Sequence, residues 1–246
     1  MKILELKIMT YNIHHGKGVD KQLCLDRILH VIKNSEADII GLNEVDRHFS
    51  KRSNYEDQIT SLAKQLNMYH SFSPSISFIS KELSPERHYG NALLSRYPIL
   101  TEKNHPFHYK SRLIEGRSVL EATVKLNRTI VRIFVSHLSL NLFLQRKQTE
   151  FIMNQKQISP FPMIIMGDWN MKPRSWGWRK MTSAFQDVWE YAGIGEGYTY
   201  PSLRPRSRLD YLFVSKDFQI LDAEVVKSIP EASDHLPLKA TIQIKE

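Results

Sequence analysis

Residues 163–170 read MIIMGDWN and place two short polar side chains directly after a run of apolar residues. Asp168 can accept a proton, orient a water molecule or face a cation, and Asn170 can donate an amide hydrogen bond to an anionic oxygen. Gly167 lets the backbone turn where the apolar run, which reads as a short buried strand, ends. Gly, Asp and Asn are also common turn formers. This segment alone is therefore consistent with either a turn or a catalytic site.

Similar polar residues occur where other apolar strands begin or end. Those that follow directly on a strand are Asn12, Glu44 and His137, and those that open a late strand are Asp210 and the pair Asp234 and His235. If the late strands run antiparallel to the earlier ones, all of these side chains share one rim of a sheet. Buried strands do not need polar residues at their ends, so the repetition indicates a functional site more strongly than any one residue does.

Together these residue types supply the parts needed to hydrolyse a phosphoester. Glu44 is a hard oxygen ligand suited to Mg²⁺, which often takes only one or two protein carboxylates. His235 has an intrinsic pKa suited to a general base near neutral pH, and either Asp210 or Asp234 could hold its other ring nitrogen. The side chains that can donate to the phosphoryl group are Asn12, Asn170 and His137. One metal ion acting as a Lewis acid and one positioned base complete the set.

Apolar periodicity predicts the elements that must position these side chains. Strands are expected at residues 4–8, 38–42, 91–95, 119–126, 131–135, 163–166, 209–214 and 236–244, and helices at residues 25–32, 59–66, 142–158 and 178–185. Strands and helices alternate early in the chain, whereas the middle and the end are rich in strands. This order suggests one mixed sheet, or two sheets with outer helices. No linker, repeat or low-complexity segment is visible, so we expect residues 1–246 to form a single domain.

Composition limits the class of protein further. The chain has 246 residues, of which 41% are apolar and 24% charged, as expected of a folded globular protein. Its one cysteine, Cys24, excludes an intramolecular disulfide and a four-cysteine metal site. No run approaches the ~18 apolar residues of a membrane span, and the N-terminal segment reads as a strand and not as a signal peptide, so we expect a cytoplasmic protein. The net charge of +8 favours anionic partners.

Seven motifs occur in an order that is itself informative. They are, along the chain, TYNIHHG, NEVD, YGNALLSRYPI, SHLSL, GDWN, RLDYLFVS and SDHLPL. In this order the chain resembles the endonuclease/exonuclease/phosphatase superfamily, which has the deoxyribonuclease-I-like fold. The motifs span nearly the whole chain, and the ordered set is far more specific than any single motif. Two further segments, EGRS and TYPSLRPRSRLDY, resemble a group of compact bacterial members.

The resemblance implies an α/β (α+β) fold, a four-layer α/β/β/α sandwich with two packed mixed β-sheets. The residues that it places at the metal are Glu44, Asn12 and Asp234. The catalytic residues that it implies are His235, Asp210, Asp168, Asn170 and His137. Among these, Asp210 orients His235, Asp168 and Asn170 position the water and the phosphate, and His137 holds a phosphoryl oxygen. The substrate-binding residues are Asn12, Asn91 and Arg117, although Arg117 could equally make a structural ion pair.

The expected activity is therefore that of a Mg²⁺-dependent phosphoester hydrolase, with Mn²⁺ as a possible substitute. The partner would be nucleic acid, a phospholipid headgroup or a small phosphoester, and we expect a monomer. The alternative is a non-catalytic module that binds nucleic acid or protein on the same fold, but such a member is expected to lose Glu44, Asp168 or His235. This chain departs from the family in having Asn43, where nucleases often have Gln, and in GDWN, which replaces GDFN.

Some residues remain ambiguous in the sequence. His14 and His15 could face the site or lie on the surface. Trp176 and Trp178, which lie among basic residues, could form a lip for the substrate or anchor the core. No acidic partner for His137 is evident.

Overall fold

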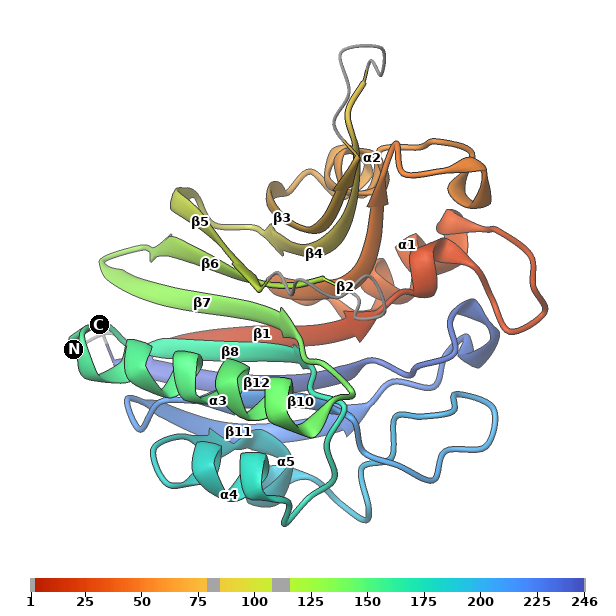
Figure 1. The fold of residues 1–246 in the computed structure, drawn as a ribbon. Coiled ribbons are helices and arrows are strands. Elements are labelled where there is room, and N and C mark those ends of the chain that lie inside the picture. Colours follow the sequence, from red (N-terminus) through yellow and green to blue (C-terminus); the bar gives the residue numbers. More distant parts are fainter. Residues whose placement is uncertain (1–2, 79–84, 108–115, 246) are drawn as a thin grey trace.

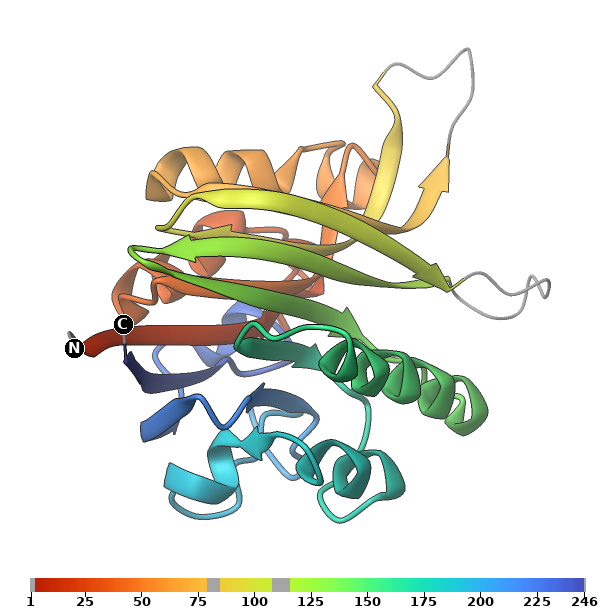
Figure 2. The same cartoon turned by 90° about the vertical axis from the view of Figure 1, so that its left-hand side faces the viewer.

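The computed structural model describes residues 3–78, 85–107 and 116–245, which form two packed six-stranded sheets with helices on the outer faces (Figures 1 and 2). The first sheet has the order β11 (Phe218–Val225), β12 (Leu238–Lys245), β1 (Ile3–Asn12), β2 (Ile39–Arg47), β4 (Arg87–Ser95) and β3 (Tyr69–Phe78). The second has the order β5 (Ile99–Phe107), β6 (Arg117–Leu126), β7 (Thr129–His137), β8 (Met163–Asp168), β10 (Asp210–Val214) and β9 (Gln186–Asp187). This is the expected four-layer sandwich.

Helices cover the outer face of each sheet. On the first sheet lie α1 (Leu25–Ser35) and α2 (Gln58–Leu66), and on the second lie α3 (Leu142–Gln157) and α4 (Trp176–Thr182). The short helix α5 (Val188–Ala192) packs against β10 and β11. The described residues also contain three single turns of 3-10 helix: η1 (His14–Gly16), η2 (Lys51–Ser53) and η3 (Pro230–Ala232). None of the helices among the described residues is long and apolar enough to cross a membrane.

Three apolar clusters fill the three interfaces between the layers. The largest lies between the sheets and includes Ile8 of β1 and Met166 of β8. The next residue along β1, Met9, belongs instead to the cluster beneath α1 and α2. Successive residues of a strand point to opposite faces, so a strand that is covered on both faces must be apolar at nearly every position. This is why β8 begins with four consecutive apolar residues, 163–166.

The register of the strands brings their polar ends to one rim. In the parallel pair β7 and β8, His137 lies opposite Asp168. In the antiparallel pair β8 and β10, Asp168 lies opposite Asp210. Asn12 likewise ends β1 beside Asn43 of β2, in a parallel pair. The expectation that the late strands run antiparallel is confirmed, because β12 also pairs antiparallel with β1.

The strand β3 was missed because its buried face is polar. Ser71, Ser73 and Ser75 of β3 are buried at the edge where β3 faces β5 and β6. Their hydroxyls pair with polar side chains across that interface: Ser73 donates to Oδ1 of Asn104 at 2.5 Å, and Ser75 lies 2.9 Å from the hydroxyl of Ser118. A strand with serines on its inner face shows no apolar alternation. The strands β5, β9 and β11 and the helix α5 were also not predicted.

A partly buried ion pair lies within the second sheet and makes stability depend on pH. Glu121 of β6 accepts hydrogen bonds from Nε2 of His105 at 2.7 Å and from Nη2 of Arg132 at 2.6 Å. These bonds outweigh burial and lower the pKa of Glu121 from 4.5 to about 2. Because the pKa of Glu121 is lower in the folded than in the unfolded protein, its ionised form stabilises the fold at pH values above the unfolded-state pKa. This stabilisation is lost as the pH falls toward the folded-state pKa. The relevant window is therefore pH 4.5 down to about 2.

We expect Glu121→Gln to destabilise the protein at neutral pH by on the order of 1 kcal/mol, since the amide cannot pair with Arg132 as an ion. The difference from the wild type should shrink between pH 4.5 and pH 2. Thermal unfolding at several pH values measures it, with Glu150→Gln on the exposed side of α3 as the control. A difference that stays constant across this window would contradict the assignment.

Candidate active site

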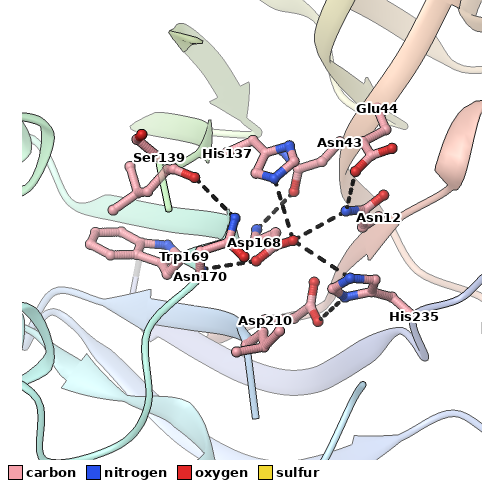
Figure 3. Close-up of polar contacts among 12 residues, drawn as sticks. Asn12, Asn43, Glu44, His137, Ser139, Asp168, Trp169, Asn170, Asp210 and His235 are labelled. Carbon is pink, nitrogen blue, oxygen red and sulfur yellow. Dashed lines mark hydrogen bonds and ion pairs between the residues drawn. The ribbon is translucent and has the colours of Figure 1, made fainter. Parts of the chain in front are cut away.

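Asp168 lies at the centre of the polar rim (Figure 3). It ends β8, and its side chain is 2% exposed. One carboxylate oxygen, Oδ2, accepts a hydrogen bond from Nδ2 of Asn12 at 3.1 Å and lies 3.5 Å from Nε2 of His137 and 3.7 Å from Nε2 of His235. The other, Oδ1, accepts from the backbone N–H of Asn170 at 2.9 Å. Burial raises the pKa of Asp168 to about 7, although the positive charge of His235 opposes this.

A glycine and a buried amide place Asp168. Gly167 has a φ of +143°, and a Cβ at this position would lie 1.8 Å from the carbonyl oxygen of Ser136. The backbone N–H of Asp168 then donates to Oδ1 of Asn43 at 2.8 Å, and Nδ2 of Asn43 donates to the same Ser136 carbonyl at 3.1 Å. Asn43 therefore joins β2 of the first sheet to β7 and β8 of the second.

Asn91 was expected to bind substrate, but the structure buries it behind the site. Its side chain is 1% exposed, accepts from Nδ2 of Asn43 at 2.7 Å and donates to the carbonyl of Ser118 at 2.8 Å. These contacts use the amide within the core. The geometry favours a role in holding Asn43 and does not favour direct contact with substrate.

We expect Gly167→Ala to destabilise the protein by at least about 2 kcal/mol, because the methyl group would overlap backbone atoms of β7. Gly195→Ala is the matched control: Gly195 also has a left-handed φ, +81°, but no atom lies within 4 Å of a Cβ there. Chemical denaturation of both variants measures the difference. Equal destabilisation of the two variants would show that the backbone conformation alone, without the close approach to Ser136, explains why glycine is needed at position 167.

Asp210 is the carboxylate that holds His235. Its Oδ2 lies 2.8 Å from Nδ1 of His235, and both side chains are almost completely buried. Burial alone would lower the pKa of His235, but the charges of Asp210 and Asp168 more than offset this and raise it to about 10. Asp234, the other candidate in the sequence, instead lies 3.9 Å from Nδ1 of His14. The ring of Tyr200 lies against His235, with 4.8 Å between the ring centroids.

A bulge in β2 turns Glu44 toward the rim. Leu42 pairs with Ala92 and Val45 with Gly90, so two residues of β2, Asn43 and Glu44, lie opposite a single residue of β4. Such a bulge re-aims side chains, and it lets Asn43 point into the sandwich while Glu44 points out. Nδ2 of Asn12 donates to Oε1 of Glu44 at 3.0 Å. Burial, and then the charge of Asp234, raise the pKa of Glu44, whereas the Asn12 hydrogen bond lowers it.

His137 is neutral and has a defined tautomer. Its Nδ1 lies 3.5 Å from Nη1 of Arg117, and because a guanidinium can only donate, Nδ1 accepts and Nε2 carries the proton. Burial, and then the charges of Arg117 and His235, hold the pKa of His137 well below its ordinary value. Nε2 faces Asp168 at 3.5 Å, so the acidic neighbour that the sequence did not reveal is Asp168.

The structure thus brings eight of the predicted residues to one rim: Asn12, Glu44, Arg117, His137, Asp168, Asn170, Asp210 and His235. Asp234 precedes His235 and lies near Glu44 and His14. Two contributions were missed by sequence reasoning, those of Tyr200 and Gln145. Gln145 donates to the carbonyls of Trp169 and Asn170 at 3.1 and 3.0 Å and so fixes the loop after Asp168. Neither residue lies at the end of a strand, which is the feature that predicts the other site residues from the sequence.

Known families share this fold. The chain belongs to the endonuclease/exonuclease/phosphatase family, whose sequence profile matches residues 9–235. It is 26% identical to the uncharacterized protein YbhP of Escherichia coli K12 over 264 residues, which covers 97% of this chain and 96% of YbhP.

Solved structures share the fold. One is an endonuclease/exonuclease/phosphatase of Beutenbergia cavernae, with a TM-score of 0.81 and 22% identity over 98% of this chain and 72% of that one. Another is a mannosyl-6-phosphatase of Bacteroides thetaiotaomicron, with a TM-score of 0.77 and 17% identity over 96% of this chain and 99% of that one. At these identities the likeness defines the fold and leaves the substrate open.

Proposed function

We propose that the chain is a Mg²⁺-dependent hydrolase of phosphoester bonds. The observation that carries this proposal is the position of Asp168, which contacts Asn12 beside Glu44 and lies 3.7 Å from the ring of His235. A water molecule near Asp168 would have a candidate base on one side and a carboxylate suited to a metal on the other. Membership of a family of phosphoester hydrolases supports the same reaction.

The donors on the Glu44 side fit a magnesium ion. Glu44, Asn12 and Asp234 offer carboxylate and amide oxygens, which are the ligands that Mg²⁺ prefers. Burial and the charge of Asp234 both raise the pKa of Glu44, so a cation beside these carboxylates would offset an unfavourable charge arrangement. When bound, Mg²⁺ would polarise the phosphoryl group and neutralise its charge, and Mn²⁺ could replace it.

His235 is the proposed general base. Because Asp210 accepts the Nδ1–H, Nε2 is the atom that can take a proton from water, and the carboxylate stabilises the imidazolium that forms. A divalent cation near Asp234 would lower the pKa of His235 from its value of about 10, since a nearby positive charge disfavours the imidazolium. In the alternative, Asp168 takes the proton and His235 contacts the phosphate.

The remaining polar groups are proposed to hold the phosphoryl oxygens. Nε2–H of His137 can donate to an anionic oxygen, and Arg117 fixes the tautomer that makes this possible. Nδ2 of Asn170 already donates to the carbonyl of Leu138 at 3.0 Å, which leaves its second N–H for substrate. Nδ2 of Asn12 donates to Glu44 on the metal side and to Asp168 on the side of His235, so Asn12 links the two halves of the site.

A panel of phosphoesters tests the proposal: DNA, RNA, phospholipids, sugar phosphates, nucleotides and bis-p-nitrophenyl phosphate, each with Mg²⁺ and with chelator. We expect turnover of at least one class that requires the metal. Absence of turnover throughout the panel, together with tight binding of nucleic acid or a protein, would favour the non-catalytic module on the same fold.

A further inference from the structure

Two consecutive histidines lie beside Glu44 on the metal side of the site. His14, His15 and Glu44 each offer a ligand atom, and these three atoms lie within 4.8 Å of one another. The proposed hydrolysis gives neither histidine a role. Asp234 is also near, with Oδ1 3.9 Å from Nδ1 of His14.

The backbone holds all three residues in an unusual conformation. The φ angles of His14, His15 and Glu44 are +44°, +46° and +59°, in the left-handed region that residues with a Cβ rarely adopt. Such strain persists only where surrounding contacts impose it, and it gathers at functional sites. Asn12 supplies two of these contacts, because its Oδ1 accepts from the N–H of His14 at 3.1 Å while its Nδ2 donates to Glu44. The buried Gln58 holds the carbonyl of His15 at 2.7 Å.

The two rings are prepared as ligands in different ways. Nδ1 of His14 lies 3.1 Å from the carbonyl oxygen of Lys17, so Nδ1 carries the proton and Nε2 keeps its lone pair. This is how the histidines of metal sites are commonly oriented. His15 is 7% exposed, and its Nδ1 is buried with no hydrogen-bond partner among the described residues. A buried polar atom without a partner is costly, and an ion bound there would remove that cost.

We propose that His14 and His15 join Glu44 as metal ligands, so that the site binds a first-row transition-metal ion such as Zn²⁺ more tightly than Mg²⁺. Imidazole nitrogens favour these ions, whereas Mg²⁺ favours oxygen ligands alone. The nearby guanidinium of Arg52 does not oppose a cation strongly, because it pairs with the buried Asp46 through two bonds of 3.0 and 2.7 Å. The inference rests on the proposed function only in taking Glu44 as a ligand.

Co²⁺ binding to the metal-stripped full chain tests this without any substrate. Visible absorption of bound Co²⁺ reports its ligands, and competition with Zn²⁺ and Mg²⁺ gives their relative affinities. We expect His14→Asn and His15→Asn each to weaken Co²⁺ binding at least about 10-fold. Asn tolerates the left-handed backbone, so the variants should keep the fold.

His48→Asn is the matched control. His48 has a φ of +51°, and its Nδ1 also lies close to a backbone carbonyl, that of Tyr55 at 2.8 Å, yet it is outside the cluster. It should bind Co²⁺ as the wild type does. Unchanged Co²⁺ affinity and spectrum in folded His14→Asn and His15→Asn would overturn the assignment, as would a wild type that binds Mg²⁺ as tightly as Zn²⁺. An enzyme that is inactive but binds Co²⁺ through these histidines would contradict only the proposed function.

A different surface carries a second inference. The α3–α4 rim, which we define as residues 140–147 and 172–180, exposes three apolar side chains in succession: Leu140 at 74%, Leu142 at 71% and Phe143 at 63%. Six basic side chains are exposed on the same two segments: Arg146, Lys147, Lys172, Arg174, Arg179 and Lys180. The two segments contain no Asp or Glu. Scattered exposed apolar residues are normal, but an apolar cluster bordered by one sign of charge indicates a binding surface.

The rim is attached directly to the active site. Its first segment follows His137 and Leu138, and Gln145 holds the carbonyl of Asn170. The starts of α3 and α4 lie at the same end of the sandwich, where β7 and β8 also end (Figures 1 and 2). Basic and aromatic side chains of the rim make cation–π contacts. Nζ of Lys147 lies 4.5 Å from the ring of Phe143, and the guanidinium of Arg146 lies 5.2 Å from the ring of Trp176.

We infer that the α3–α4 rim binds the surface of an anionic phospholipid bilayer. Basic residues are attracted to anionic lipids, while exposed Leu and Phe side chains enter the boundary between headgroups and acyl chains. Single-stranded nucleic acid would use the basic and aromatic groups for stacking, but it would leave Leu140 and Leu142 in water. If the proposed function holds, phospholipid headgroups are then the phosphoesters presented to the site.

Vesicle sedimentation in EDTA tests binding apart from turnover. We expect the wild type to sediment with vesicles of phosphatidylcholine and phosphatidylglycerol, and less with phosphatidylcholine alone or at high salt. The double variant Leu142→Ser, Phe143→Ser should bind at least about 10-fold more weakly, because burial of each apolar side chain in the lipid contributes favourable free energy to binding. Leu100→Ser, on β5 and 49% exposed, is the control and should bind normally.

Equal vesicle binding by the double variant and the wild type would overturn the inference, as would no binding to anionic vesicles. Loss of binding to a labelled DNA strand in the double variant, with vesicle binding retained, would assign the rim to nucleic acid instead. The double variant should hydrolyse bis-p-nitrophenyl phosphate at the wild-type rate. Vesicle binding without any turnover would contradict the proposed function and leave the membrane surface intact.

Discussion

Replacement of His235 by alanine is expected to lower turnover at least about 10²-fold, because Nε2 of this ring is the proposed acceptor of the proton from water. Asp210→Asn should also be severely impaired, since an amide cannot stabilise the imidazolium and can favour the wrong tautomer. Both variants should fold, because neither side chain belongs to the apolar clusters that fill the sandwich. Steady-state rates on bis-p-nitrophenyl phosphate, with circular dichroism as the check on folding, measure these effects.

The pH dependence of two variants separates His235 from Asp168 as the base. The rate should rise with pH as the base loses its proton. If His235 is the base, His235→Ala removes this rising limb. If Asp168 takes the proton, Asp168→Asn removes the rising limb. His235→Ala then lowers the rate at every pH, but the rising limb remains. A rising limb that survives in His235→Ala would rule out our assignment of the base.

Replacement of Glu44 is expected to have the second large effect. Glu44→Ala should raise the Mg²⁺ concentration needed for half-maximal activity at least about 100-fold. Mutation of groups that only orient a metal ligand already lowers metal affinity about 10–100-fold. Glu44→Gln keeps the size and shape of the side chain and is the more conservative variant, and it should share the defect. Titration of the rate with Mg²⁺ measures it, and Asp222→Ala, exposed on β11, is the control. An unchanged metal requirement in Glu44→Gln would remove Glu44 from the metal site.

Much of the site could be predicted because a polar residue at the end of an apolar strand is visible in a sequence. Asp168, His137 and Asn12 all follow such strands, and the pairing of β7, β8 and β10 then brings His137, Asp168 and Asp210 into register. The layered fold was predicted from the resemblance more than from the apolar pattern. The apolar pattern alone was consistent with either one sheet or two.

What could not be predicted depends on contacts between distant segments. The bulge that lets Asn43 point inward and Glu44 outward has no sequence signal of its own, so the buried hydrogen bond between Asn43 and Asn91 could not be predicted. Tyr200 reaches His235 from a long loop whose path depends on tertiary contacts. The strand β3 escaped detection because its buried serines pair with polar groups across the interface, which reverses the usual polarity of an inner face.

Metal-dependent hydrolysis at the Asp168 site is tested most directly by one chelation experiment. The rate of the full chain on bis-p-nitrophenyl phosphate is measured with Mg²⁺, after EDTA, and after Mg²⁺ or Mn²⁺ is restored in excess. We predict activity that disappears with chelator and returns with the metal, because the carboxylates of Glu44 and Asp234 offer oxygen ligands for such an ion. Full activity after thorough chelation would contradict the metal-dependent mechanism.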